Sequence, residues 1–136
     1  IIIADVWKTA PFMALLLLAG LQTVPYSLEE AARIDGASPW QFFWRVRLPL
    51  LLPTLLIAAM FRALDAFRIF DLVYVLTGGG PADSTEVLST LTYKILFSTL
   101  QFGYGSALAG AMFVTELLIA AGFALIIVTK IRDAER

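Results

Sequence analysis

Cysteine and histidine are both absent from the 136 residues, and charged residues make up only 15% of the chain. Without cysteine there is no disulfide framework and no thiol nucleophile, and without either residue there is no zinc site of the usual kind. A formal net charge of −1 and the lack of any basic run exclude a nucleic-acid footprint. We therefore predict no metal site, no cofactor bound by this chain and no nucleic-acid partner, and we rank an intramembrane enzyme last among the functional classes.

Long apolar runs dominate what is present. Apolar residues make up 60% of the chain and mean hydropathy is +0.83, against about 45–50% apolar residues in soluble domains. The runs are long enough to cross a bilayer core of about 30 Å, which predicts an all-α membrane domain over residues 1–136. The expected spans are residues 2–23, 48–75 and 104–129, with a polar loop at 26–47 and an outer loop at 77–102 that contains an interfacial helix at 86–101.

The polar loop between the first two spans contains several residues that typically begin or end helices. Ser27 and Glu30 have the spacing of a capping box that would begin a short helix, and Gly36 stands where a glycine would end it. Ser38-Pro39-Trp40-Gln41 predicts a second helix start, with Ser as the N-cap and Gln at N3. We expect Leu48-Pro49 to close that second helix, so the loop would form two short helices joined by a glycine.

Ordered motifs in and around this loop resemble the permease subunits of ABC importers. Glu30-Ala31-Ala32, Asp35-Gly36-Ala37 and Leu48-Pro49 match the EAA loop of those permeases. The stretches 5–22 and 70–81 are similar to the carbohydrate-uptake branch, of the maltose and glycerol-phosphate type. The resemblance covers nearly the whole chain.

The resemblance implies the fold of a type I ABC importer permease, with cytoplasmic coupling helices in the EAA loop. This loop would dock into a cleft on an ATPase subunit and transmit its closure to the spans. The expected partners are two ATPase subunits that bind ATP and Mg²⁺, a second homologous permease subunit, an external solute-binding protein, a carbohydrate and membrane lipid. The chain itself would not be an enzyme. The residues assigned to coupling are Glu30, Ala31, Ala32, Asp35 and Gly36, with Glu30 the expected salt-bridge partner of the ATPase.

The distribution of basic residues predicts the orientation. Arg33, Arg45 and Arg47 lie in the polar loop, Lys130, Arg132 and Arg136 lie in the tail, and the outer loop holds only Lys94. By the positive-inside rule, the EAA loop and the C-terminus face the cytoplasm in a multi-pass inner-membrane protein, and the glycine-rich turn faces outside. Since the chain begins in an apolar run without an initiator Met, we also expect it to be the C-terminal part of a longer permease.

Several ionisable residues are expected at membrane depth, where a lone charge costs about 2.5–3.5 kcal/mol on insertion scales. They are Lys8, Arg62, Asp65 and Glu116, with Asp5 and Arg68 somewhat further out. Two interpretations stay open, and both can hold: ion pairs between helices, with Arg62–Glu116 and Asp5–Lys8 as candidates, or a polar cavity that binds sugar hydroxyls. The cavity candidates are Arg62, Asp65, Ala66, Ile69 and Glu116, although relatives often carry amides where Ala66 and Ile69 stand.

The same acids support a second functional hypothesis, an ion-coupled secondary transporter in which Asp65 or Glu116 carries a proton or cation. Such a protein would transport its substrate without an ATPase partner. This hypothesis accounts for acids inside the spans and leaves the EAA loop unexplained.

The glycine run Gly78-Gly79-Gly80-Pro81 is not a phosphate-binding loop, because no Lys-Ser/Thr pair follows it and no strand precedes it. We expect a flexible turn outside the membrane rather than a direct substrate contact. The resemblance implies that this turn lies near the place where the external solute-binding protein docks.

Overall fold

The computed structural model describes residues 1–134 and contains only helices, turns and loops in that range. Arg136, which was expected to add positive charge to the tail, lies outside the described residues. The helices are α1 (Ile2–Gln22), α2 (Tyr26–Ile34), α3 (Pro39–Phe42), α4 (Leu48–Phe67), α5 (Asp71–Leu76), α6 (Leu88–Tyr93) and α7 (Phe102–Ala134), with π-helical turns at Phe43–Arg47 and Lys94–Ser98. The expected all-α class is confirmed.

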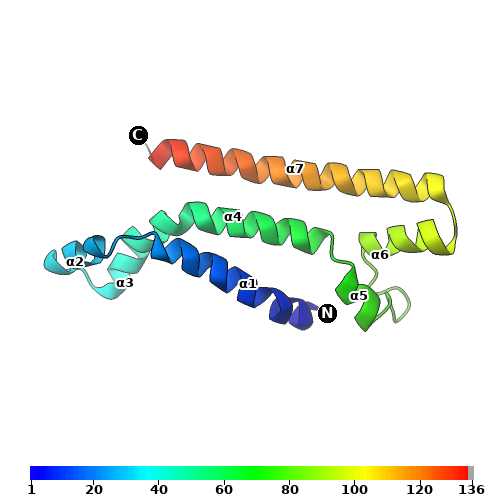
Figure 1. Ribbon diagram of the computed structural model, residues 1–136, viewed down its shortest axis with the longest axis horizontal. Helices are drawn as coiled ribbons and strands as arrows, with labels where there is room; N and C mark the ends of the chain where they lie inside the picture. The colour runs from blue at the N-terminus through cyan, green and yellow to red at the C-terminus, as the bar shows by residue number, and fades with distance from the viewer. Residues whose placement is uncertain (135–136) are drawn as a thin grey trace.

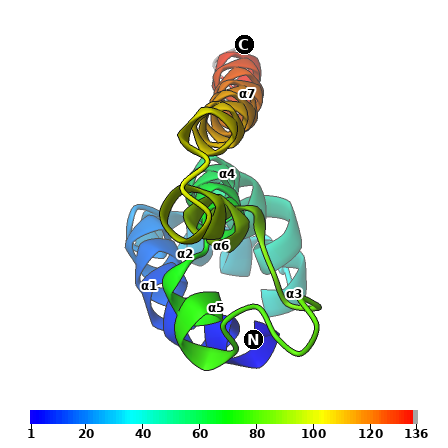
Figure 2. The same ribbon diagram turned by 90° about the vertical axis from the view of Figure 1, so that its right-hand side faces the viewer.

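The three long helices α1, α4 and α7 run along the length of the molecule (Figure 1). Helix α4 packs against both α1 and α7, and the end-on view places it between them (Figure 2). The short helices α2 and α3 lie at the same end as the C-terminus, whereas α5 and α6 lie at the other end with the N-terminus. The molecule therefore has two distinct ends, each built from short helices.

Three helices within residues 1–134 are long and apolar enough to cross a membrane: Ile2–Gln22, Pro39–Phe67 and Phe102–Lys130. The second begins well before the expected residue 48, so the prediction that Leu48-Pro49 closes a separate short helix is wrong. The π-helical turn Phe43–Arg47 explains the continuity. In a regular α-helix the ring of Pro49 would clash with the carbonyl of residue 45, and a wider turn just before a proline relieves that contact.

The second span ends at Phe67 rather than at the expected residue 75. The chain breaks after Arg68 and restarts as α5 at Asp71. At the break, the Ser89 hydroxyl donates a hydrogen bond to the carbonyl of Ile69. This bond replaces a helical partner that the carbonyl loses, so a residue from the outer loop stabilises the end of the span.

The predicted interfacial helix at 86–101 is shorter than expected, because only Leu88–Tyr93 and the turn Lys94–Ser98 are helical. Together they fall below the about 20 residues that a span needs. This segment packs against α7. A Cβ on Gly105 of α7 would come within 2.5 Å of the Leu96 side chain, so the glycine permits the close approach.

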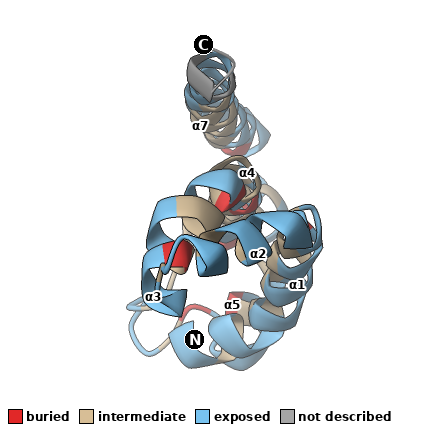
Figure 3. Ribbon diagram, turned by 90° about the vertical axis from the view of Figure 1, so that its left-hand side faces the viewer, coloured by how far each residue is buried: buried red, intermediate tan, exposed pale blue. Residues whose placement is uncertain are grey.

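Burial is sparse, and the few buried residues are spread over the long helices, the short helices at both ends and the outer loop (Figure 3). The buried apolar residues among those described are Phe42, Leu51, Ala58 and Val73. Gly20 of α1 is also buried, and a Cβ there would lie 2.6 Å from the Thr54 side chain of α4. Most apolar side chains of α1 and α7 face outward, as expected of helices that contact lipid or further helices.

Candidate functional site

Helix α2 ends at a glycine, as the sequence predicts. Gly36 has φ +74°, a conformation that glycine adopts without a Cβ penalty. The Ala37 N–H donates to the Ala32 carbonyl at 2.9 Å, and the Gly36 N–H donates to the Arg33 carbonyl at 3.1 Å. These two bonds form a Schellman motif, which turns the chain sharply between α2 and α3. We call residues 26–47 the elbow.

Helix α3 begins after Ser38, which forms a complete capping box with Gln41. The Gln41 N–H donates to the Ser38 hydroxyl at 3.3 Å, and the Ser38 N–H donates to the Gln41 side-chain oxygen at 2.9 Å. The capping box expected at Ser27 is wrong, because Pro25 caps α2 and the helix begins at Tyr26. Ser27 therefore lies inside the first turn, where its side chain makes no cap hydrogen bond.

Glu29 joins the two halves of the elbow. One carboxylate oxygen accepts from Arg33 on its own helix at 2.9 Å, and the other accepts from Arg47, eighteen positions along the chain, at 2.9 Å. The Arg47 guanidinium lies 5.1 Å from the centre of the Phe42 ring, close enough for a cation–π contact. Glu29 was not predicted from the sequence as a functional residue. Its spacing to Arg33 was a signal for the intrahelical pair, but no local pattern indicated Arg47.

The residues that the resemblance assigns to coupling lie on α2 and at the turn after it. Glu30, Ala31, Asp35 and Gly36 are exposed and Ala32 is half-buried. Within residues 1–134, Glu30 makes no ion pair. The surface of small side chains beside the exposed carboxylates of Glu30 and Asp35 can therefore be approached closely by another protein. We call these five residues the coupling surface.

A cavity of about 480 Å³ lies between α1, α4 and α7. Its lining combines cations, acids and aromatic rings, a mixture that suits a polar ligand with apolar faces. Three of the five expected cavity residues (Arg62, Asp65 and Glu116) line it, whereas Ala66 and Ile69 do not. The other lining residues are Lys8, Thr9, Phe12, Met13, Phe61, Leu64 and Arg68.

The ion pairs around this cavity differ from both expected pairs. Arg62 pairs with Asp5 on α1 and with Asp65 one turn along its own helix, so the predicted Arg62–Glu116 pair is wrong. Lys8 pairs with Asp71 at 2.6 Å rather than with Asp5. Asp71 begins α5, which the chain break after α4 places beside the first turns of α1. Glu116 borders the cavity from α7 without an ion-pair partner among the described residues.

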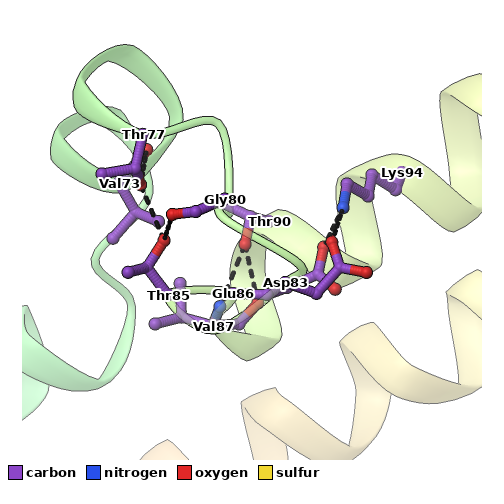
Figure 4. Close-up of polar contacts among 9 residues, drawn as sticks. All are labelled: Val73, Thr77, Gly80, Asp83, Thr85, Glu86, Val87, Thr90 and Lys94. Carbon is purple, nitrogen blue, oxygen red and sulfur yellow. Dashed lines mark hydrogen bonds and ion pairs between the residues drawn. The ribbon is translucent and has the colours of Figure 1, made fainter.

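The outer loop is held by side chains rather than being an unsupported turn (Figure 4). The hydroxyls of Thr77 and Thr85 lie 2.8 Å apart, and the Thr85 hydroxyl donates to the Gly80 carbonyl at 2.9 Å. Gly78 and Gly79 have φ of +59° and +92°, a left-handed conformation that favours glycine. The expectation of a flexible turn, drawn from the glycine run, therefore overlooked the two threonines that close this loop.

Lys94 forms ion pairs that connect the same loop to the helical segment that follows it. Its ammonium lies 2.8 Å from Asp83 and 2.6 Å from Glu86. The hydrogen bonds to Asp83 and then to Glu86 raise the pKa of Lys94 above its ordinary value of 10.5. The one basic residue of the outer loop is thus paired with two acids of the loop.

Comparison with known proteins identifies the family. A family model described as "binding-protein-dependent transport system inner membrane component" matches residues 1–133. The trehalose/maltose transport system permease protein MalF of Thermococcus litoralis is 52% identical over 86% of this chain and 39% of its own length. The trehalose transport system permease protein SugA of Mycobacterium tuberculosis is 50% identical over 88% of this chain and 38% of its own length.

A shorter relative, the putative ABC transporter permease protein ORF1 of Caldicellulosiruptor, is 40% identical over 93% of this chain and 89% of its own length. The chain spans about two fifths of the length of the two sugar permeases. The match over nearly all residues, together with helices of membrane length, confirms the resemblance seen in the EAA motifs. The chain belongs to the binding-protein-dependent transport system inner membrane components, the permease family of ABC importers.

Proposed function

We propose that this chain is part of the permease subunit of an ABC importer that carries a sugar or sugar derivative into the cell. In this proposal separate ATPase subunits bind the elbow, and the membrane-crossing helices move when the two ATPase subunits come together. An external solute-binding protein delivers the sugar, and a second permease subunit completes the pathway. ATP and Mg²⁺ are bound by the ATPase subunits, so the chain transports without being an enzyme.

The observation that carries the proposal is the coupling surface, which lies between two membrane-length helices. Glu30 is exposed and lacks an ion pair within the described residues, beside side chains small enough for close contact. A carboxylate that becomes buried at an interface needs a cationic partner, which an ATPase subunit would supply. Membership of the family supports this function over the ion-coupled transporter.

A carbohydrate substrate is supported by the relatives and by the chemistry of the cavity. The relatives are named for trehalose, maltose and sulfoquinovosyl glycerol. The cavity offers carboxylates and guanidinium groups, which bind hydroxyls, beside Phe12 and Phe61, whose rings suit the apolar face of a sugar. We propose Arg62, Asp65 and Glu116 as its polar contacts.

The proposed orientation places the elbow and the C-terminus in the cytoplasm. The basic residues of the described chain support it, because Arg33, Arg45, Arg47, Lys130 and Arg132 all belong to the end of the molecule that carries α2, α3 and the C-terminal part of α7. The outer loop with Gly78-Gly79-Gly80-Pro81 would then face the solute-binding protein.

The decisive test is purification of the full-length permease from membranes as wild type, Glu30→Ala and Ser27→Ala. Wild type is expected to retain an ATPase subunit and to show sugar-stimulated ATP hydrolysis. Glu30→Ala should lose the subunit or the stimulation, because the carboxylate is removed. Ser27→Ala is the matched control, since Ser27 is exposed on the same helix and caps nothing. Sugar uptake by wild type without any ATPase would refute the proposal.

A further inference from the structure

The elbow consists of two parts that the backbone joins through non-helical links. Helices α3 and α4 and the π-helical turn between them form one continuous helix of 29 residues, Pro39–Phe67. We call this continuous helix the rod. Helix α2 is not part of it. It is linked to α1 through Thr23–Pro25 and to α3 through Asp35–Ser38, and both links are non-helical.

This division matters for transmitting a movement. The coupling surface lies on α2 and the turn after it, whereas the membrane-crossing helix is the rod. A displacement applied to α2 alone would be absorbed by the two non-helical links, because loop and element-terminal residues take up large backbone changes in hinges. Something other than the backbone has to hold α2 against the rod.

The Glu29–Arg47 ion pair makes that connection. Arg47 is the last residue before α4, and its guanidinium lies 2.9 Å from the Glu29 carboxylate. Both side chains are substantially shielded, with 34% and 24% of their surface exposed. Arg33 occupies the second oxygen of Glu29, and the buried Phe42 ring lies against Arg47. Each partner is therefore fixed from a second side, which lowers the entropy cost of forming the pair.

The neighbouring charges do not make a similar link. Arg45 is exposed, and it forms no ion pair with the side chains that the structure describes. Glu30 is exposed on α2 and points to no partner within the described residues. Both arginines lie at the membrane edge, where each could serve simply as a positive charge. Arg47 differs from Arg45 because it has a specific acceptor, Glu29, on α2.

We propose that Glu29 and Arg47 are positioning residues that join α2 to the membrane-crossing rod, so that force on the coupling surface moves the span. The pair sets how much sugar is moved for each ATP hydrolysed, not whether the ATPase binds. This inference rests on the proposed function, and it assigns to Glu29 a role separate from that of Glu30.

The test uses the full transporter in proteoliposomes, with sugar uptake and ATP hydrolysis measured in the same preparation. Glu29→Gln and Arg47→Gln are expected to retain the ATPase subunit but to lower uptake per ATP by about fivefold or more, the range of ordinary coupling energies. The double variant should be no worse than either single variant, because the two side chains act as one unit. Arg45→Gln, which removes the same charge from the same turn, should match wild type.

A second experiment does not depend on the charge. Cysteine replaces both Glu29 and Arg47 in a full-length background without other cysteines, and a short flexible bifunctional maleimide joins them. Uptake per ATP should be low before joining and should recover afterwards, in the same protein. Recovery that fails although the cross-link has formed would overturn the inference.

The outcomes separate the two proposals. If wild type lacks an ATPase, the proposed function fails. If wild type is coupled and Glu29→Gln or Arg47→Gln is equally coupled, only the present inference fails. It also fails if either variant loses the ATPase subunit, since the pair would then serve docking, or if Arg45→Gln lowers uptake per ATP as strongly.

Discussion

At the scale of single residues, Gly20 marks the closest approach of α1 and α4. Its missing side chain leaves room for Thr54, whose Cβ would lie 2.9 Å from a Cβ at position 20. That atom is fixed to the backbone and cannot rotate away. The two helices would have to separate to admit even a methyl group, and the same contact helps place Arg62 beside Asp5 further along the pair.

We therefore expect Gly20→Ala to destabilise the permease by about 1–3 kcal/mol, the usual cost of overpacking. In detergent, thermal unfolding should begin a few degrees lower than in wild type. Gly122→Ala is the control, because a Cβ at Gly122 meets nothing within 4 Å and alanine favours a helix. An unchanged melting temperature in Gly20→Ala would contradict the close contact.

Asp71 gives a pH-dependent prediction. The hydrogen bond from Lys8 is the main cause that lowers the pKa of Asp71 below its ordinary value of 3.8. A lowered pKa means that the carboxylate stabilises the folded state above pH 3.8 and that this contribution is lost as the pH falls through the lowered value. The attachment of α5 to α1 should weaken only in acid.

Amide hydrogen exchange can follow this attachment through the N–H groups of Tyr74 and Thr77, which bond to carbonyls of the same helical segment. Corrected for intrinsic rates, their protection should fall below about pH 4 in wild type. In Asp71→Asn it should be lower at neutral pH and change less with acid. Protection that is equal in both proteins at every pH would rule out a role for the pair.

At the scale of elements, the short-range features of the elbow were predictable from sequence and the long-range ones were not. Gly36 and Ser38 follow rules that involve only a few neighbouring residues, and both were confirmed. Ser27 was misplaced because Pro25 competes for the same helix start. The partner of Arg62 depends on how α1 lies against α4, which one-dimensional spacing does not contain, so the chosen pair with Glu116 was wrong.

The second span shows the same limit. Its apolar residues predicted a helix up to residue 75, but the chain turns after Phe67. The carbonyl released there is satisfied by Ser89, twenty positions away. Similarly, three of the five cavity candidates line the cavity because they project from facing helices, whereas Ile69 already belongs to the break. Only the fold reveals these contributions from distant segments.

The attachment of the outer loop to the helical segment after it leads to a further prediction. Lys94→Gln removes both ion pairs, so the loop should open more often. The N–H groups of Thr85 and Glu86, which bond to Gly79 and Asp83 within the loop, should exchange about two- to fivefold faster at neutral pH. Lys94→Arg keeps the charge and is the control. Equal exchange in all three proteins would show that the threonine hydroxyls alone hold the loop.

At the scale of the whole molecule, the arrangement of the ends predicts which residues share a side of the membrane. The elbow and the C-terminal part of α7 lie at one end, and the outer loop lies at the other (Figure 1). The proposed orientation, with the elbow end in the cytoplasm, rests on the basic residues at that end. It can be measured without disturbing the fold, since exposed serines are available at both ends.

In a full-length background without other cysteines, Ser84→Cys should react with a membrane-impermeant maleimide on intact cells. Ser27→Cys should react only after the membrane is opened. Both serines are exposed, so a difference in labelling reports the side of the membrane rather than burial. The opposite pattern would reverse the proposed orientation, and labelling of both in intact cells would place the two loops on the same side.

The sparse burial of α1 and α7 also has a consequence for synthesis and turnover. Because so few side chains of these helices are buried, a newly inserted chain exposes both apolar and charged side chains. Lipid can cover the apolar ones, but charged ones such as Glu116 need protein or water beside them. A copy without the partner subunits proposed above would be a target for membrane proteases. We expect its cellular half-life to shorten when those companions are not expressed, which pulse-chase labelling can measure.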